Sequence, residues 1–279
     1  MFSPSQTDLA ALAQAYDVFF VDQFGVLRDD VGPYEGAISA LSTLASHGTR
    51  IVILSNSGRS GDYNSERLIR LGFAADSFEE FVTSGDVAFE LLSRATAPIA
   101  KSVRCFTVSS GEDRNLADRL GLVSSDTARD ADVVFISGSE AERISMDEYR
   151  EILRPAAERQ TPCYCTNPDI HKLHGGRIAP GAGSLAKLYE EMGGVVTWLG
   201  KPYPEIYERA LRLAHITDRG RVLCIGDSIE HDILGAKNAG LKSALVRTGI
   251  LADKADDDLA GLSQQYGGYP DYVLKSFTF

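Results

Sequence analysis

Carboxylate, hydroxyl and ammonium side chains follow apolar runs at several points of this sequence. Asp22 comes after the run 18–21, Ser55 ends a second run, and Asp227 follows a third. Lys201 lies in a tight Gly-Lys-Pro turn, and Asp232 comes five residues after Asp227. Carboxylates bind hard divalent cations, and a lysine and a hydroxyl bind phosphoryl oxygens. We therefore expect these five residues to bind a cation and a phosphoryl group together.

The elements that must position these residues read as strands alternating with helices. Apolar runs of this kind are typical of strands that are buried on both faces, and the stretches between them have helical spacing with serine or glycine at their ends. Such alternation predicts a parallel α/β sheet, in which ligands bind at the carboxyl ends of the strands. The expected strands are 18–25, 51–58 and 222–228, and the expected helices are 36–48, 203–216 and 228–240.

The middle of the chain repeats the alternation on a smaller scale. Its expected strands are 102–110, 130–139 and 161–167, with helical stretches between them. Because they fall between the second and third of the strand ends described above, we predict an inserted α/β domain at 88–183. The core domain would then comprise 1–87 and 184–279. The acidic run 254–261 is expected to be a solvated loop or the start of a helix.

Composition restricts the partners of the protein. The net charge is −11, so the protein as a whole repels nucleic acid and anionic membranes, and an anionic substrate needs local cations, metal or backbone N–H groups. No segment has the ~18 apolar residues of a transmembrane helix, and the N-terminus reads as a short helix rather than a signal peptide. The spacing of the 4 cysteines fits neither a zinc site nor a disulfide framework, which predicts reduced thiols in a cytoplasmic protein.

In this order, the motifs VDQFGVL, LSNS, GKP and GDSIEHD resemble the four motifs of the haloacid dehalogenase superfamily of phosphohydrolases. The stretches TNPD, APGAGSLAKLYEEMGG and GKPYPEIYERAL are similar to its class IIA branch, and FVTSGDVAFELL resembles the segment that leads into the cap of that branch. The branch contains phosphatases of sugar phosphates, nucleotides, glycerol phosphate and pyridoxal phosphate. The resemblance spans nearly the whole chain. It implies a Rossmann-like core with a parallel sheet and a smaller α/β cap domain inserted after the second motif.

The resemblance also implies roles for the matching residues. Asp22 would be the nucleophile that attacks phosphorus and forms an aspartyl phosphate. Ser55 and the backbone N–H of Asn56 would hold the phosphate, and Lys201 would neutralise both the nucleophile and the phosphate. The implied ligands of Mg²⁺ are Asp22, the backbone carbonyl of Phe24, Asp227 and, through a water molecule, Asp232.

Phe24 departs from the pattern of the family. Its phosphatases carry a second aspartate there, which protonates the leaving oxygen and then activates water, and such acid–base help is worth roughly 10²–10⁴ in rate. A phenyl ring does neither, although the backbone carbonyl still offers a metal ligand. Asp29 and Asp30 follow closely, and one of them swinging into the site is an alternative source of the acid, but we expect both to be ordinary loop acids.

The predicted cap would select the substrate. Asn167 and Asp169 in TNPD are the candidates to bind it, with His171 and His174 nearby. A histidine in such a stretch is more often an ordinary surface residue, and a mobile loop that contacts substrate is the alternative interpretation. Arg59 and Arg177 are further candidates for phosphate or substrate contacts, and a solvated role is open for each.

These observations predict a cytoplasmic, Mg²⁺-dependent hydrolase of a small phosphate ester, such as a sugar phosphate or similar metabolite, that is slow on alkyl phosphates. One alternative is a phospho-ligand-binding or regulatory protein that kept the site and lost turnover. Another is a dehalogenase, since that branch has a tyrosine at the place of Phe24, yet it gives up the metal carboxylates that Asp227 and Asp232 retain here. Caps of class IIA often associate, which favours a homodimer.

Overall fold

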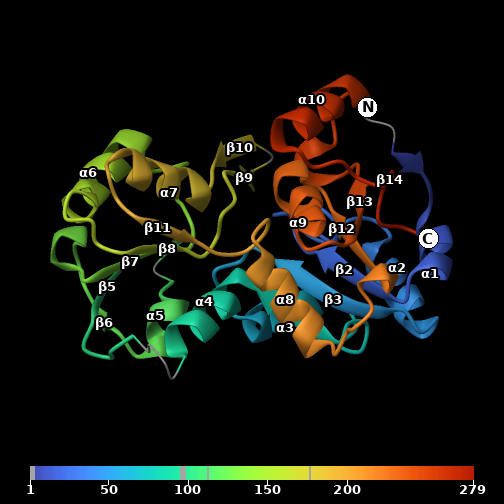
Figure 1. Ribbon diagram of the computed structural model, residues 1–279, viewed down its shortest axis with the longest axis horizontal. Coiled ribbons are helices and arrows are strands. Elements are labelled where there is room, and N and C mark those ends of the chain that lie inside the picture. The colour runs from blue at the N-terminus through green and yellow to red at the C-terminus, as the bar shows by residue number, and fades with distance from the viewer. Residues whose placement is uncertain (1–3, 95–98, 112, 176) are drawn as a thin grey trace. The chain divides into compact units, whose positions relative to one another are not determined.

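The computed structural model describes residues 4–94, 99–111, 113–175 and 177–279, and within it the chain divides into two compact units. Unit 1 comprises Met1–Ser55, Gly61–Val82 and Lys201–Phe279. Unit 2 comprises Asn56–Ser60 and Thr83–Gly200. Each unit is built on its own parallel sheet (Figure 1).

The sheet of unit 1 has 7 strands in the order β1-β14-β13-β12-β2-β3-β4. Along the chain, β2, β3 and β4 extend the sheet in one direction, and β12, β13 and β14 extend it in the other. The order therefore reverses between β12 and β2, which are parallel neighbours, and this is where ligands bind in open α/β sheets. The strands are β1 (Ser5–Gln6), β2 (Val18–Asp22), β3 (Arg50–Ser55), β4 (Glu80–Thr83), β12 (Val222–Gly226), β13 (Lys242–Val246) and β14 (Tyr272–Leu274).

Burial on both faces explains the continuous apolar runs of the central strands. Every residue of β2 and β12 is buried, and one face packs on α2 through Phe19, Leu41 and Leu44. The helices of unit 1 are α1 (Leu9–Ala15), α2 (Ala37–Ser46), α3 (Gly61–Arg70), α8 (Pro204–Leu213), α9 (Leu234–Asn238) and α10 (Asp256–Tyr266), with 3₁₀ turns at Arg219–Arg221 and Gly249–Leu251.

Two sequence predictions for unit 1 are refined by the structure. The expected helix 228–240 is divided into a wide turn, Ile229–Ile233, and α9. The turn is widened because the N–H of Ile233 donates to the carbonyl of Ser228, five residues before it, at 3.1 Å. The acidic run 254–261 contains the start of a helix, because α10 has three aspartates in its first turn, where acidic side chains favour the helix dipole.

Unit 2 contains a sheet of 5 strands in the order β11-β8-β7-β5-β6, with parallel pairing throughout, and a separate antiparallel pair. The sheet strands are β5 (Arg104–Val108), β6 (Val123–Ser124), β7 (Val133–Ile136), β8 (Cys163–Cys165) and β11 (Val196–Trp198), and the pair is β9 (His171–His174) with β10 (Arg177–Pro180). The helices are α4 (Ser84–Ser93), α5 (Asn115–Leu120), α6 (Met146–Ala157) and α7 (Ala182–Glu191), with a 3₁₀ turn at Ala128–Asp130.

The boundaries of unit 2 differ from the expected insertion at 88–183. Unit 2 reaches Gly200 because β11 pairs with β8, and α7 contributes Leu185 and Tyr189 to the core of this unit. It begins again at Thr83 because α4 starts at Ser84. The stretch His171–His174, for which a mobile loop was the alternative interpretation, is strand β9, and all four of its residues pair with β10.

The expected fold class, a mixed α/β protein with a Rossmann-like parallel sheet and a second, smaller α/β unit, is confirmed. Across the described ranges, none of the helices has the length and apolarity that crossing a membrane requires.

Candidate active site

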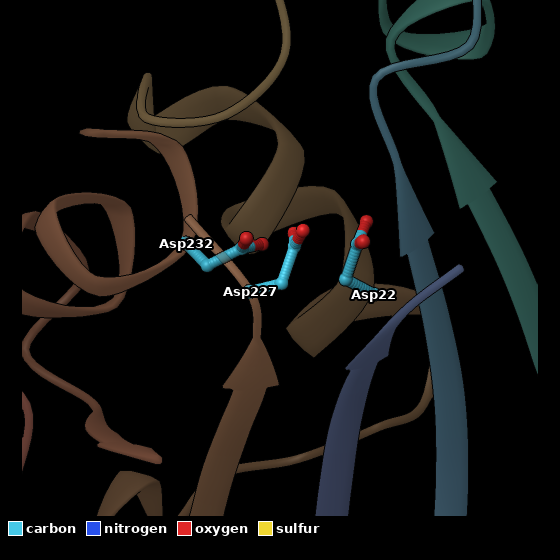
Figure 2. Close-up of side chains that lie close together, drawn as sticks. All are labelled: Asp22, Asp227 and Asp232. Atoms are coloured by element: carbon cyan, nitrogen blue, oxygen red, sulfur yellow. The ribbon is translucent and has the colours of Figure 1, made fainter. Parts of the chain in front are cut away.

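The carboxyl ends of β2 and β12 bring two acids to the same edge of the sheet of unit 1. Asp22 is the last residue of β2, and Asp227 directly follows β12. With Asp232, they form a buried cluster in which one carboxylate oxygen of each residue lies within 4.8 Å of the other two. Figure 2 shows the three carboxylate groups turned to the same side beyond the strand ends. Carboxylate oxygens that bind one small cation together must lie within ~6 Å of one another, and these oxygens meet that requirement.

Lys201 joins two members of this cluster. Its Nζ lies 2.5 Å from Oδ1 of Asp22 and 2.6 Å from Oδ1 of Asp232. The lysine side chain is only 4% exposed, and its Nζ also donates to the carbonyl of Leu54 at 3.4 Å. Burial alone would lower the pKa of Lys201, but the two aspartates outweigh it and raise the pKa, so the ammonium stays charged.

The cluster has more negative than positive charge. It contains three carboxylates, of which Lys201 contacts two, and all three acids are buried. Burial raises the pKa of Asp227 well above its usual value, and the neighbouring charges of Asp22 and Asp232 add to the effect. A divalent cation would remove this excess. An all-oxygen set of carboxylates fits Mg²⁺, and Asp22, Asp227 and the backbone carbonyl of Phe24 would hold it, with Asp232 beside them.

Two glycines with positive φ let the backbone approach Asp227 closely. A Cβ on Gly25, at φ +103°, would lie 2.1 Å from Oδ2 of Asp227, and one on Gly249, at φ +64°, would lie 1.8 Å from the same oxygen. Any side chain at either position would therefore displace the carboxylate. The N–H of Ile250 donates to this oxygen at 2.9 Å. Sequence reasoning missed Gly249 and Ile250, which follow the polar residues Arg247 and Thr248 after the end of β13.

Phe24 presents its ring to solvent beside the cluster. It is 38% exposed, and the guanidinium carbon of Arg28 lies 5.4 Å from the ring centroid. The carboxylate of Asp29 is used by the loop itself, since Oδ1 accepts from the N–H groups of Val31 at 2.8 Å and Gly32 at 2.9 Å. If the side chain of Asp29 turned towards the cluster to act as the acid, both of these hydrogen bonds would be broken.

Ser55 and the residue before Phe24 meet at the ends of β2 and β3. Ser55 is buried, and its Oγ lies 3.5 Å from Oε1 of Gln23. Asp22 is opposite Leu54 in the register of the two strands, so Gln23 and Ser55 follow as neighbours. Unit 1 therefore contains six of the predicted site residues, which are Asp22, Phe24, Ser55, Lys201, Asp227 and Asp232.

The predicted substrate-binding residues Asn56, Asn167 and Asp169 lie together in unit 2. Nδ2 of Asn56 donates to Oδ1 of Asp169 at 2.8 Å, and Oδ1 of Asn167 accepts from the N–H of Asp169 at 3.1 Å. Among the other candidates, Arg59 forms an ion pair with Asp113, and His174 is 61% exposed with Nδ1 3.9 Å from Glu142. His171 and Arg177 lie on the paired strands β9 and β10.

Comparison with known proteins identifies the family. A model described as haloacid dehalogenase-like hydrolase matches residues 19–123, and a HAD-hydrolase-like model matches 198–278. Chronophin of Mus musculus is 30% identical over 244 residues, which are 86% of this chain and 83% of that protein. The chain belongs to the haloacid dehalogenase-like hydrolases. This confirms the family inferred from the four motifs.

Other members of the family are similar over most of the chain. A haloacid dehalogenase-like hydrolase from Brucella suis 1330 has a TM-score of 0.81 at 31% identity, with 98% of this chain and 99% of that chain covered. D-glycerol 3-phosphate phosphatase of Mycobacterium tuberculosis is 28% identical over 87% of this chain and 66% of that protein. The structure of a glycerol phosphate phosphatase from that organism with magnesium has a TM-score of 0.72 at 26% identity, covering 95% of this chain and 77% of that chain.

Proposed function

We propose that this hydrolase removes the phosphoryl group from a small phosphate ester, such as a sugar phosphate or similar metabolite, with Asp22 as nucleophile and Mg²⁺ as cofactor. The observation that supports this most is the buried cluster of Asp22, Asp227 and Asp232 with Lys201 between two of its members. Such a cluster needs a cation and offers a nucleophile beside an ammonium group. Relatives named as phosphatases, among them a 4-nitrophenylphosphatase of Schizosaccharomyces pombe, support the same reaction class.

In the proposed mechanism, a carboxylate oxygen of Asp22 attacks phosphorus, and the bond between phosphorus and the leaving-group oxygen breaks. Lys201 holds Asp22 in place and offsets the charge of the phosphoryl oxygens, while Ser55 and the N–H of Asn56 would donate to those oxygens. Bound Mg²⁺ would supply further charge neutralisation at the phosphoryl group. Water then attacks the aspartyl phosphate and releases inorganic phosphate. Because Phe24 offers no proton, the leaving oxygen takes its proton from solvent, and good leaving groups are favoured.

The substrate-selecting residues in this proposal are Asn167 and Asp169 of unit 2, as the sequence predicts. The proposed surroundings of the enzyme are the cytoplasm, which is supported by the four cysteines, all of them free and buried. The homodimer expected from the resemblance is tested by the solution mass of the 30.2 kDa chain.

The second candidate function is a phospho-ligand-binding or regulatory protein without significant turnover. It is favoured by Phe24, which places a ring beside the guanidinium of Arg28 where family phosphatases carry the acid–base aspartate. Both candidates share a phosphate site, and they differ in turnover.

A phosphatase assay separates the two. The wild-type chain and Asp22→Asn are assayed on 4-nitrophenyl phosphate and glycerol phosphate, with Mg²⁺ and with a chelator. The proposed function predicts Mg²⁺-dependent release of phosphate that Asp22→Asn lowers by at least ~10³-fold, because an amide is not a nucleophile toward phosphorus. Binding of phosphate without release from either ester would instead support the binding protein.

A further inference from the structure

Gln23, between the proposed nucleophile and Phe24, has a buried side chain that the mechanism above does not use. The residue is 5% exposed, and its Oε1 lies 3.5 Å from Oγ of Ser55. Among the residues that the structure describes, the amide nitrogen of Gln23 has no hydrogen-bond acceptor. Within the described residues this nitrogen is not one of the fully buried atoms that lack a partner, so part of it is accessible and its N–H groups are available to a neighbouring group or a ligand.

The approach of Gln23 to Ser55 is fixed by the backbone on both sides. The carbonyl of Gln23 accepts from the N–H groups of Leu27 at 3.1 Å and Arg28 at 3.2 Å, which holds residue 23 at the start of its turn. Ser55 is the last residue of β3, and β3 pairs with β2 up to Asp22. The amide and the hydroxyl are therefore kept adjacent by two paired strands, and an apolar side chain of the same length would fill this space without unpaired polar atoms.

We propose that Gln23 is a positioning residue that directs the hydroxyl of Ser55 toward the phosphoryl group. A serine hydroxyl has one proton, and that of Ser55 is directed to Oε1 of Gln23. The separation of 3.5 Å is at the outer limit of a hydrogen bond, so the hydroxyl turns away at little cost. If the amide rotates by half a turn, its N–H donates to Oγ of Ser55, and the serine proton is left to donate to a phosphoryl oxygen.

This inference rests on the proposed function in one respect, namely that Ser55 contacts a phosphoryl oxygen. It explains why an amide, rather than a carboxylate or an apolar group, follows Asp22. An amide both accepts from and donates to the hydroxyl, whereas a carboxylate only accepts and would draw the serine proton away from the ligand.

The test measures the affinity of inorganic phosphate for the full chain in the presence of Mg²⁺ by titration calorimetry. The variants are Gln23→Met, which keeps length and volume, Gln23→Glu, which keeps shape but only accepts, Ser55→Ala, and the Gln23→Met/Ser55→Ala double variant. We expect Gln23→Met to weaken binding ~5-fold, Ser55→Ala ~10-fold, and the double variant no more than Ser55→Ala alone. Gln23→Glu is expected to weaken binding more than Gln23→Met, because it also adds a negative charge.

Additivity decides between positioning and packing. If the losses of Gln23→Met and Ser55→Ala multiply in the double variant, or if Gln23→Met binds phosphate as tightly as the wild type, the inference is overturned. Should Gln23→Met fail to fold, as a urea titration shows, Gln23→Glu decides, and wild-type affinity in that variant overturns the inference. If the wild type binds phosphate but does not hydrolyse esters, the proposed reaction is contradicted and this inference is unaffected. If the wild type binds no phosphate, the inference is refuted.

Discussion

Each of the two units contains a lysine paired with an acid, and the two pairs have almost the same length. In unit 1, Nζ of Lys201 is 2.6 Å from Asp232, and its side chain is 4% exposed. In unit 2, Nζ of Lys172 is 2.6 Å from Glu142, and its side chain is 24% exposed. Burial, rather than distance, therefore separates them. A buried ion that loses its partner has no solvent to replace it, whereas a half-exposed ion does.

The largest contrast is expected in stability when each lysine is replaced by methionine. Lys201→Met leaves Asp22 and Asp232 buried without their cation and is expected to lower the free energy of unfolding by about 3–5 kcal/mol, a factor of roughly 10²–10⁴ in the unfolding equilibrium. Lys172→Met, the matched control, is expected to lower it by about 0–1 kcal/mol. Urea unfolding without metal measures both. Equal losses in the two variants would show that burial is not what distinguishes the pairs.

Replacement of Phe24 by aspartate extends the acidic character of the site of unit 1. The new carboxylate would be placed to protonate the leaving oxygen and to activate water, so turnover of an alkyl phosphate is expected to rise ~10²-fold. An aryl phosphate, whose leaving group needs little protonation, is expected to gain less in its first step. In the wild type, the aryl ester should give a burst followed by slow turnover, because hydrolysis of the aspartyl phosphate lacks a base.

The control for this substitution is Phe24→Asn, which has the same shape as the aspartate variant but acts as neither an acid nor a base near neutral pH. Circular dichroism and urea unfolding check that both variants fold, since 62% of the surface of Phe24 is covered in the wild type. Unchanged rates for a folded Phe24→Asp protein on both esters would mean that another residue transfers the protons.

The acids of the two units are expected to respond to pH with opposite signs. Burial, Asp22 and Asp232 raise the pKa of Asp227 above its usual 3.8, so the folded state holds this proton more tightly than the unfolded state. Its contribution to stability therefore falls as pH rises above 3.8. Burial is the largest single influence on the pKa of Glu142 and raises it. The hydrogen bonds from Lys172 and from the backbone, together with the charges of Lys172 and His174, outweigh burial and lower the pKa below the usual 4.5, so this contribution is lost as pH falls.

Thermal unfolding without metal measures both contributions. The wild type, Asp227→Asn and Glu142→Gln are compared between pH 3 and 8, in steps on the order of one pH unit. The stability difference between wild type and Asp227→Asn should shrink or change sign as pH rises, and that between wild type and Glu142→Gln should grow. Mg²⁺ is expected to stabilise the wild type increasingly with pH, because it binds ionised carboxylates, and to do so less in Asp227→Asn. If both stability differences changed with pH in the same direction, the expected contrast between Asp227 and Glu142 would be wrong.

The strand-end residues of unit 1 could be predicted from sequence because parallel strands bring their carboxyl ends to one edge. Asp22, Ser55 and Asp227 each end or follow a continuous apolar run, and the structure places each run as a strand of one sheet. What holds Asp227 could not be predicted in the same way. Gly249 approaches it only because φ is positive there and β13 lies beside β12, and neither fact is visible in a single sequence.

Unit 2 extends to Gly200, beyond the expected boundary at 183, for a related reason. Strand β11 is only 3 residues long and has no buried residue, so it has no apolar run to reveal it, and only its pairing with β8 assigns it to this sheet. The stretch His171–His174 is polar and half-exposed, and its pairing with β10 makes it a strand. In both cases tertiary pairing, rather than local propensity, decides the structure.

The smallest effect is expected at Asp29, an acid of unit 1 that is close to Phe24 in sequence but outside the buried cluster. Its Oδ1 accepts from two backbone N–H groups of its own loop, those of Val31 and Gly32, so it acts as a turn residue. Asp29→Asn keeps that oxygen as an amide carbonyl and removes the acid. Turnover of an alkyl phosphate is therefore expected to stay within ~2-fold of the wild type, and stability within about 0.5 kcal/mol.

A second substitution distinguishes the turn from the acid at this position. Asp29→Ala removes both hydrogen bonds and is expected to lower the free energy of unfolding by about 0.5–2 kcal/mol, as loss of a side-chain cap does, with turnover per folded molecule again near that of the wild type. If instead Asp29→Asn lowered turnover of alkyl phosphates by ~10²-fold with unchanged stability, Asp29 would be the acid that Phe24 lacks. That result would show that an acid of unit 1 can take part in catalysis without belonging to the buried cluster. Burial would then not distinguish the catalytic acids of unit 1 from partly exposed acids such as Glu142 in unit 2.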